Sequence, residues 1–167
     1  VVDRRTIELS DAAVPTSRQP YHAVMGARSS EAPRVERRLR GIVERVTRRS
    51  LAALLGEYNR ARRVRGVALV VGSTIDPATI GNDHIRAHAL EGQLFRTALQ
   101  RAARASRLPC TTLVERTLYE TAAERFKRPA TALKSAVAEL GQPVEGPWRA
   151  DEKAAALAAW LMLRSVH

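Results

Sequence analysis

The segment Gly66-Val-Ala-Leu-Val-Val-Gly72 is a short apolar run that ends in glycine, and the turn Ser73-Thr-Ile-Asp-Pro77 follows it. A helical pattern of polar and apolar residues extends from about residue 82 to residue 107, and a second run, Leu108-Pro-Cys-Thr-Thr-Leu-Val-Glu-Arg116, comes next. A strand, a helix and a strand within about fifty residues match the size and order of a parallel βαβ unit. We therefore predict such a unit, with its chemistry at the carboxyl ends of the strands.

The first thirty-two residues predict a β-hairpin followed by a loop. Residues 1–10 alternate loosely between polar and apolar and indicate a strand. Residues 11–20 hold two prolines and several small polar residues, which is typical of an exposed turn. The run Tyr21-His-Ala-Val-Met-Gly26 is interpreted as the returning strand.

A basic helical segment is predicted over residues 33–62. Its apolar residues recur at spacings of three, four or eight and form one stripe, although Ser50 is also a plausible start for a separate helix. The other face carries Arg34, Arg37, Arg38, Arg40, Arg45, Arg48 and Arg49, and further arginines, Arg62 and Arg63 among them, precede the first strand. A basic face is either solvated surface or a surface that contacts phosphates.

The last third of the chain predicts three helices. Two cover residues 119–126 and 131–140, with Pro129 between them, and a third begins at Asp151 and is apolar from residue 154 to residue 163. Trp148 is expected to pack where the preceding loop meets the core. We therefore expect one domain over residues 1–167, with the βαβ core and these helices in residues 66–165.

The net charge indicates a polyanionic partner. The 167 residues include 28 basic and 17 acidic side chains, which gives a formal charge of +11. Only Lys127, Lys134 and Lys153 are lysines, and the remaining basic residues are arginines, which bind phosphates in a bidentate way. A GC-rich genome would explain arginine in place of lysine but not the charge, so nucleic acid is favoured over a membrane.

The composition also bears on the compartment. The single cysteine, Cys110, excludes a framework of intramolecular disulfides, and the longest apolar run, residues 154–163, is too short to span a bilayer. The sequence begins at Val1, as a fragment or a chain processed after import would. An intracellular location is expected, in the bacterial cytoplasm or an organelle matrix.

Two carboxylates are candidates for a metal site. Glu115 ends the second predicted strand, and Asp151 begins the last predicted helix, so the two can converge on a hard cation such as Mg²⁺. The alternatives are a helix N-cap for Asp151 and an ordinary exposed charge for Glu115.

Three further residues share a face of the predicted helix. His84, His88 and Glu91 fall at positions i, i+4 and i+7. Zinc sites use such spacing, but HExxH is absent and Cys110 is not placed to help. We therefore interpret the histidines as surface or partner-contacting residues.

Four motifs together resemble the YqgF-type Holliday-junction resolvases of the RNase H-like superfamily, in matching order over residues 50–165. The family patterns "VGLP", "LPVxxxDER", "EAER" and "D-x-x-A-A" resemble, in turn, Val71-Gly72-Ser73-Thr74, Leu108-Pro-Cys-Thr-Thr-Leu-Val-Glu-Arg116, Ala123-Glu124-Arg125 and Asp151-Glu-Lys-Ala-Ala155. The resemblance implies an RNase H-like α/β fold, with a mixed sheet, an N-terminal β-hairpin and helices on both faces.

The same resemblance implies a Mg²⁺-dependent endonuclease on branched DNA or precursor rRNA. Glu115 and Asp151, with Asp3 as the candidate on the first strand, would be catalytic, and Arg37, Arg38, Arg45, Arg48, Arg49, Arg62 and Arg63 would bind nucleic acid. Asp3 lacks the glycine that the family places after its first acid, and Val114 stands where the family has aspartate. The alternative is a catalytically degenerate subunit of a ribonucleoprotein or another large assembly.

Overall fold

The structure, a computed structural model, describes residues 3–25, 28, 30–60 and 63–165. Contacts divide the chain into two compact units, which we call the sheet unit and the helical unit. The sheet unit comprises Val1–Thr6, Arg65–Ser73 and Leu108–His167, and the helical unit comprises Ile7–Val64 and Thr74–Arg107.

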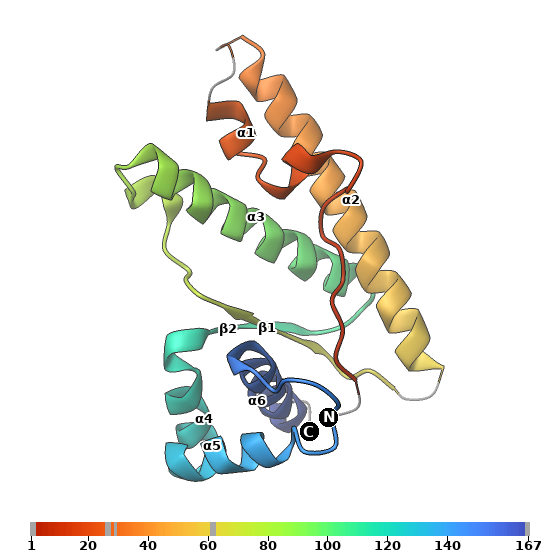
Figure 1. The fold of residues 1–167 in the computed structure, drawn as a ribbon, viewed down its shortest axis with the longest axis vertical. Helices are drawn as coiled ribbons and strands as arrows, with labels where there is room; N and C mark the ends of the chain where they lie inside the picture. Colours follow the sequence, from red (N-terminus) through yellow and green to blue (C-terminus); the bar gives the residue numbers. More distant parts are fainter. Residues whose placement is uncertain (1–2, 26–27, 29, 61–62, 166–167) are drawn as a thin grey trace. The chain divides into compact units, whose positions relative to one another are not determined.

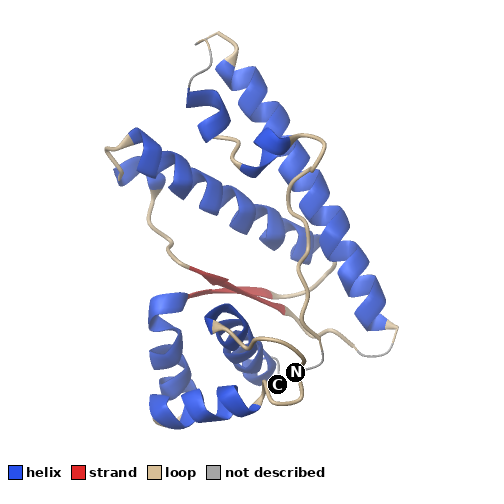
Figure 2. Ribbon diagram, in the orientation of Figure 1, coloured by secondary structure: helices blue, strands red, loops and turns tan. Residues whose placement is uncertain are grey.

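The predicted βαβ order is confirmed. Strands β1 (Val67–Val71) and β2 (Cys110–Val114) pair in parallel, with Val71 opposite Val114. Helix α3 (Asp83–Ala105) connects them, and the Asn82 side chain caps its first turn by accepting a hydrogen bond from the N–H of Ile85 at 3.0 Å. Within the described residues the sheet consists of these two strands, drawn in red in Figure 2. Helix α3 belongs to the helical unit, although it connects the two strands of the sheet unit.

The three C-terminal helices form the core of the sheet unit. Helices α4 (Leu118–Phe126), α5 (Ala130–Glu139) and α6 (Ala150–Ser165) agree with the prediction. Their buried side chains are Leu118, Ala122, Leu133, Val137, Ala154, Leu157, Ala158 and Leu161, against which Ala68, Val70 and Leu113 of the strands pack. Trp148 packs as expected, and its Nε1–H donates to the carbonyl oxygen of Val137 at 2.9 Å. In the described part of the chain, no helix combines the length and the apolar character needed to cross a bilayer.

The helical unit is built on one long helix. Helix α2 (Ala32–Asn59) packs against α3, as the orange and green helices of Figure 1 show. The alternative of a separate helix starting at Ser50 is not seen, because Leu51 and Leu55 continue the buried stripe of Val43 and Val46 along one continuous helix. Two 3₁₀ turns, η1 (Pro15–Arg18) and η2 (Pro77–Thr79), and the short helix α1 (His22–Met25) complete the unit.

The predicted N-terminal hairpin is wrong for the described residues. Residues 3–9 belong to neither a helix nor a strand, and most of the expected returning strand is α1. The Arg4 guanidinium donates to the carbonyl oxygens of Glu145, at 3.1 Å, and Pro147, so side-chain contacts take the place of a strand ladder. Val1, Val2 and Gly26 lie outside the described residues. The mixture of helices and strands is α/β, but the predicted RNase H-like mixed sheet is not seen in the part of the chain that the structure describes.

Glu152 closes the first turn of α6. Its Oε2 accepts the N–H of Arg149 at 2.9 Å, which is the reciprocal half of a capping box, and its Oε1 lies 3.2 Å from Nη1 of Arg4. Hydrogen bonds from backbone N–H groups, first that of Glu152 itself and then that of Arg149, outweigh partial desolvation and lower the pKa of the Glu152 carboxyl, and Arg4 acts in the same direction. The ionised form is therefore favoured in the folded protein.

We predict a pH-dependent loss of stability in Glu152→Gln. Because the folded pKa is lowered, the stabilisation is complete above the usual glutamate pKa of about 4.3 and disappears as the pH falls through the folded value. Thermal unfolding followed by circular dichroism should give a lower Tm for the variant at neutral pH and converging Tm values in acid. Glu124→Gln, at an exposed position of α4, is the control and should match the wild type throughout. A Tm difference between Glu152→Gln and the wild type that stays equally large in acid would contradict the stabilising role of the ionised Glu152 carboxylate.

Candidate functional site

Glu115 and Asp151 line one hollow of the sheet unit. Because the strands are parallel, their carboxyl ends meet at one edge, where Val71 ends β1 and Val114 ends β2. Glu115 follows β2 directly and begins the turn η3 (Glu115–Thr117), while Asp151 lies in the first turn of α6. The hollow measures about 230 Å³ and is lined by Ala68, Val70, Val71, Gly72, Glu115, Asp151, Ala154 and Ala155. The structure thus brings together the two carboxylates that the sequence selects.

Small side chains explain why a hollow exists at this edge. Helix α6 packs against β1, and Ala154 and Ala155 of the helix and Ala68 of the strand line the hollow. A larger residue at any of these positions would occupy part of the space. Gly72 adds to the opening, because nothing lies within 4 Å of the place where its Cβ would be.

The surroundings of Glu115 and Asp151 bear on their alternative roles as an ordinary exposed charge and a helix N-cap. Asp151 is not an N-cap, since α6 begins one residue earlier and Glu152 supplies the capping contact. Its position in the first turn is nevertheless favourable for a negative charge near a helix N-terminus. Both Glu115 and Asp151 are exposed, and neither side chain forms a hydrogen bond or ion pair with a described residue. Their oxygens are therefore available to an external ligand.

Asp3 is not among the residues that line the hollow. Its Oδ1 accepts the N–H of Arg4 at 2.6 Å, and its Oδ2 lies 2.7 Å from Nε of Arg5. The carboxylate is thus engaged by its own neighbours in the chain. Two carboxylates and several waters suit one Mg²⁺ ion, which commonly takes only one or two protein carboxylates and completes its shell with waters and substrate phosphates.

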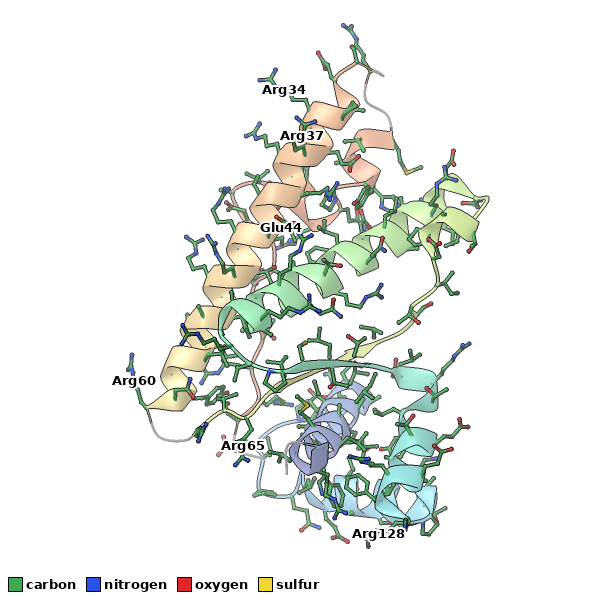
Figure 3. The ribbon with its side chains drawn as sticks, turned by 180° about the vertical axis from the view of Figure 1, so that it is seen from behind. Arg34, Arg37, Glu44, Arg60, Arg65 and Arg128 are labelled. Carbon is green, nitrogen blue, oxygen red and sulfur yellow. The ribbon has the colours of Figure 1, made fainter. Side chains whose placement is uncertain are left out.

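A second candidate surface lies on α2. At about 100° per residue, six of its arginines fall within an arc of about 120° on the helix surface. We call this set the arginine stripe, and it consists of Arg34, Arg37, Arg38, Arg45, Arg48 and Arg49. From its first to its last residue it extends about 22 Å along the helix axis. Figure 3 shows Arg34 and Arg37 on the part of α2 that precedes Glu44.

The arginine stripe is exposed, and its side chains form no ion pairs with described residues. All six side chains are exposed, and none forms an ion pair or side-chain hydrogen bond with a described residue. Arg40, which the sequence placed on the same face, differs, because it pairs with Glu36 at 3.2 Å. Glu44 pairs instead with Arg101 of α3 at 2.6 Å. The stripe therefore holds a concentrated positive charge that the described protein leaves unneutralised.

The remaining predicted contact residues follow α2 in the chain. Arg63 is exposed, and Arg62 lies outside the described residues. Arg37, Arg38, Arg45, Arg48 and Arg49, by contrast, share one face of a single continuous helix. The predicted residues of α2 thus lie together on one exposed helix face, and their contact with nucleic acid stays a prediction.

A third cluster lies within the helical unit. His84 and His88 occupy successive turns of α3, and His22 of α1 joins them, with ring centroids 4.2–4.7 Å apart. The carboxylate of Glu91 lies beside His22 and His88, at 2.9 Å and 3.7 Å from their Nδ1 atoms. One imidazole nitrogen from each histidine lies within 4.8 Å of the others, so the three can hold a metal ion.

His22 is the member of this cluster that the sequence did not reveal. It precedes His84 by 62 residues and lies in a segment predicted as a strand, so no local spacing connects the two. Tyr21 explains how His22 is held, since its ring packs against Val43 and Leu94 of the core, and burial there raises the pKa of its hydroxyl. Packing of α1 against α2 and α3 is what brings His22 to the other two histidines, and a sequence prediction of α1 as a helix would have been needed to find it.

Comparison of the chain with protein-family models, with curated proteins and with solved structures gives no match. The resemblance to the YqgF-type resolvases accordingly remains a prediction.

Proposed function

We propose that this protein binds nucleic acid and that the arginine stripe of α2 contacts the phosphate backbone. The observation that carries the proposal is the set of six exposed arginines on one helix face, none of them paired with a described carboxylate. Guanidinium groups bind phosphate oxygens in a bidentate way, and release of the condensed counterions favours the complex.

Repulsion between neighbouring arginines of α2 is a second argument for a phosphate-binding surface. Arg34 and Arg38, like Arg45 and Arg49, are i, i+4 neighbours of equal charge, and each such pair destabilises a helix by about 0.2–0.5 kcal/mol. A polyanion would reverse this repulsion, because its phosphates would lie between or beside the guanidinium groups. A binding surface for a polyanion would therefore explain why arginines of like charge lie so close together on α2.

A membrane surface fits less well. A helix that lies in a membrane interface places a free apolar face among the lipids. The apolar face of α2 is instead buried inside the helical unit, with Leu39, Ile42 and Val46 in one cluster and Val43 in another. Only the charged face remains for a partner, which favours a ligand recognised by its phosphates.

A second candidate function is Mg²⁺-dependent hydrolysis of a phosphodiester. It is favoured by one observation, that Glu115 and Asp151 line the same hollow without partners among the described residues. Mg²⁺ held by these oxygens would orient a phosphate and make a bound water more acidic. In this proposal the arginine stripe binds the substrate. Without cleavage, the protein would instead act as a nucleic-acid-binding subunit of a ribonucleoprotein.

The binding proposal predicts a particular salt dependence. If all six arginines contact phosphates, log K against log salt has a slope of about −4 for single-stranded and −5 for double-stranded nucleic acid. The triple variant Arg38→Ala, Arg45→Ala, Arg49→Ala should weaken binding and make the slope about 2–3 less steep. Fluorescence anisotropy with labelled duplex and single-stranded RNA and DNA at several salt concentrations measures both quantities.

A control variant that removes the same amount of charge elsewhere distinguishes binding by the arginine stripe from binding that depends on net charge alone. The triple variant Arg104→Ala, Arg116→Ala, Arg128→Ala also removes three exposed arginines, all outside α2. It should retain most of the wild-type slope. Equal losses in the two triple variants would show that binding follows net charge alone and would refute the proposed surface.

The endonuclease proposal makes a separate prediction about cleavage. If the hollow is catalytic, wild-type protein with Mg²⁺ cleaves four-way junction DNA or precursor rRNA, and both Glu115→Gln and Asp151→Asn lose cleavage while keeping wild-type affinity, because the arginine stripe is intact. Gel analysis of end-labelled substrates gives the rates, and Glu120→Gln, at an exposed position of α4, is the control. Tight binding by the wild type without Mg²⁺-dependent cleavage would rule out the endonuclease and leave the binding function in place.

A further inference from the structure

We propose that His22, His84 and His88 form a binding site for a divalent transition metal, with Zn²⁺ as the natural occupant. This site lies in the helical unit and involves neither Glu115 nor Asp151. It uses three of the four histidines in the chain. Imidazole nitrogen is a ligand that zinc, copper and nickel prefer, whereas Mg²⁺ takes oxygen ligands.

The spacing of the nitrogen atoms fits a tetrahedral ion. Nε2 of His22 lies 3.2 Å from Nδ1 of His84. With Zn–N bonds of 2.0–2.1 Å, two ligands of a tetrahedral zinc are about 3.3–3.4 Å apart. His88 follows His84 by one helical turn, and its ligand nitrogen lies within 4.8 Å of the other two. His84 and His88 are exposed, so their side chains are free to adjust around an ion.

Glu91 supplies the carboxylate that commonly supports a metal-binding histidine. Its side chain is 7% exposed, and its Oε1 lies 2.9 Å from Nδ1 of His22 and also accepts the backbone N–H of His22 at 3.3 Å. A proton on Nδ1, donated to Glu91, leaves the lone pair of Nε2 directed at the cluster. This carboxylate–histidine arrangement fixes the tautomer and makes the ligand nitrogen more basic.

The buried carboxylate of Glu91 is a further argument for a metal ion at this site. Buried carboxylates are paired with cations or contribute to metal sites, because an isolated buried charge is costly. Among the described residues, the side-chain partners of Glu91 are the two imidazoles of His22 and His88, and no arginine or lysine contacts it. A metal ion bound by the same imidazoles would provide the balancing positive charge.

The alternative is a cluster held together only by hydrogen bonds between neutral imidazoles. One N–H bond from His84 to His22 would satisfy the 3.2 Å contact but would not explain why His88 also lies 4.2 Å from His22, ring to ring. Three ligands leave the fourth tetrahedral position to water or to an external ligand, as in zinc sites that keep an open position. The ion would also link α1 to the first turns of α3.

The test measures metal binding and stability on the full chain. Protein stripped with a chelator is titrated with Zn²⁺, Co²⁺ or Mg²⁺ by calorimetry, and its Tm is recorded with and without each ion. We expect one Zn²⁺ per chain, a higher Tm with Zn²⁺ but not with Mg²⁺, and the intense visible absorption of tetrahedral Co²⁺. A wild type that binds Zn²⁺ no more tightly than Mg²⁺ would overturn the proposal.

Variants assign the ligands. His84→Ala and His88→Ala change exposed residues, so their metal-free forms should fold like the wild type by circular dichroism while Zn²⁺ binding is lost. Glu91→Gln should weaken Zn²⁺ binding by about 10–100-fold, as removal of an outer-shell partner does. Asp83→Asn removes an adjacent exposed charge and should leave binding unchanged. Zn²⁺ binding that survives both histidine variants, or is weakened equally by Asp83→Asn, would contradict the assignment.

Discussion

Two parallel strands that lie side by side cannot be joined by a tight turn, and this constraint shapes the whole chain. Because β1 and β2 run in the same direction, the chain has to return from the end of one to the start of the other by a long connection. That connection contains α3, which packs against α2 in the helical unit. The same pairing brings the ends of both strands to one edge, where the hollow with Glu115 and Asp151 lies. The place of the carboxylate hollow at this edge and a connection long enough to contain α3 thus both follow from one parallel ladder.

The helical unit holds two opposite excesses of charge. On the exposed face of α2, the arginine stripe gathers positive charge that no described carboxylate neutralises. Inside the unit, Glu91 is a buried negative charge whose side-chain partners among the described residues are imidazoles. Each excess would be balanced by a ligand of the opposite sign, a polyanion for the stripe and a metal cation beside Glu91. The two proposals therefore share a physical basis but rest on separate residues and can fail separately.

The long periodic segments and the two strands of this sequence were predictable, and the short N-terminal segments were not. The helical periods of α2 and α3 exceed five turns, so their buried and exposed faces could be assigned from spacing, and the arginine stripe with them. The four residues of α1 support a strand or a helix equally well, and packing of Tyr21 on the core decides between them. The error concealed His22, because its partnership with His84 exists only in three dimensions. Convergence of Glu115 and Asp151 was expected from their places at the end of a strand and the start of a helix, and both line the hollow.

Chemical footprinting of arginines is the most direct measurement of whether phosphates contact the arginine stripe. The protein is treated with phenylglyoxal, which modifies accessible guanidinium groups, with and without saturating duplex RNA or DNA, and modified sites are quantified by mass spectrometry. We expect bound nucleic acid to protect Arg38, Arg45 and Arg49, while Arg104 and Arg128, exposed and outside α2, react as in the free protein. Equal reactivity of the stripe in the free and the saturated protein would contradict this expectation.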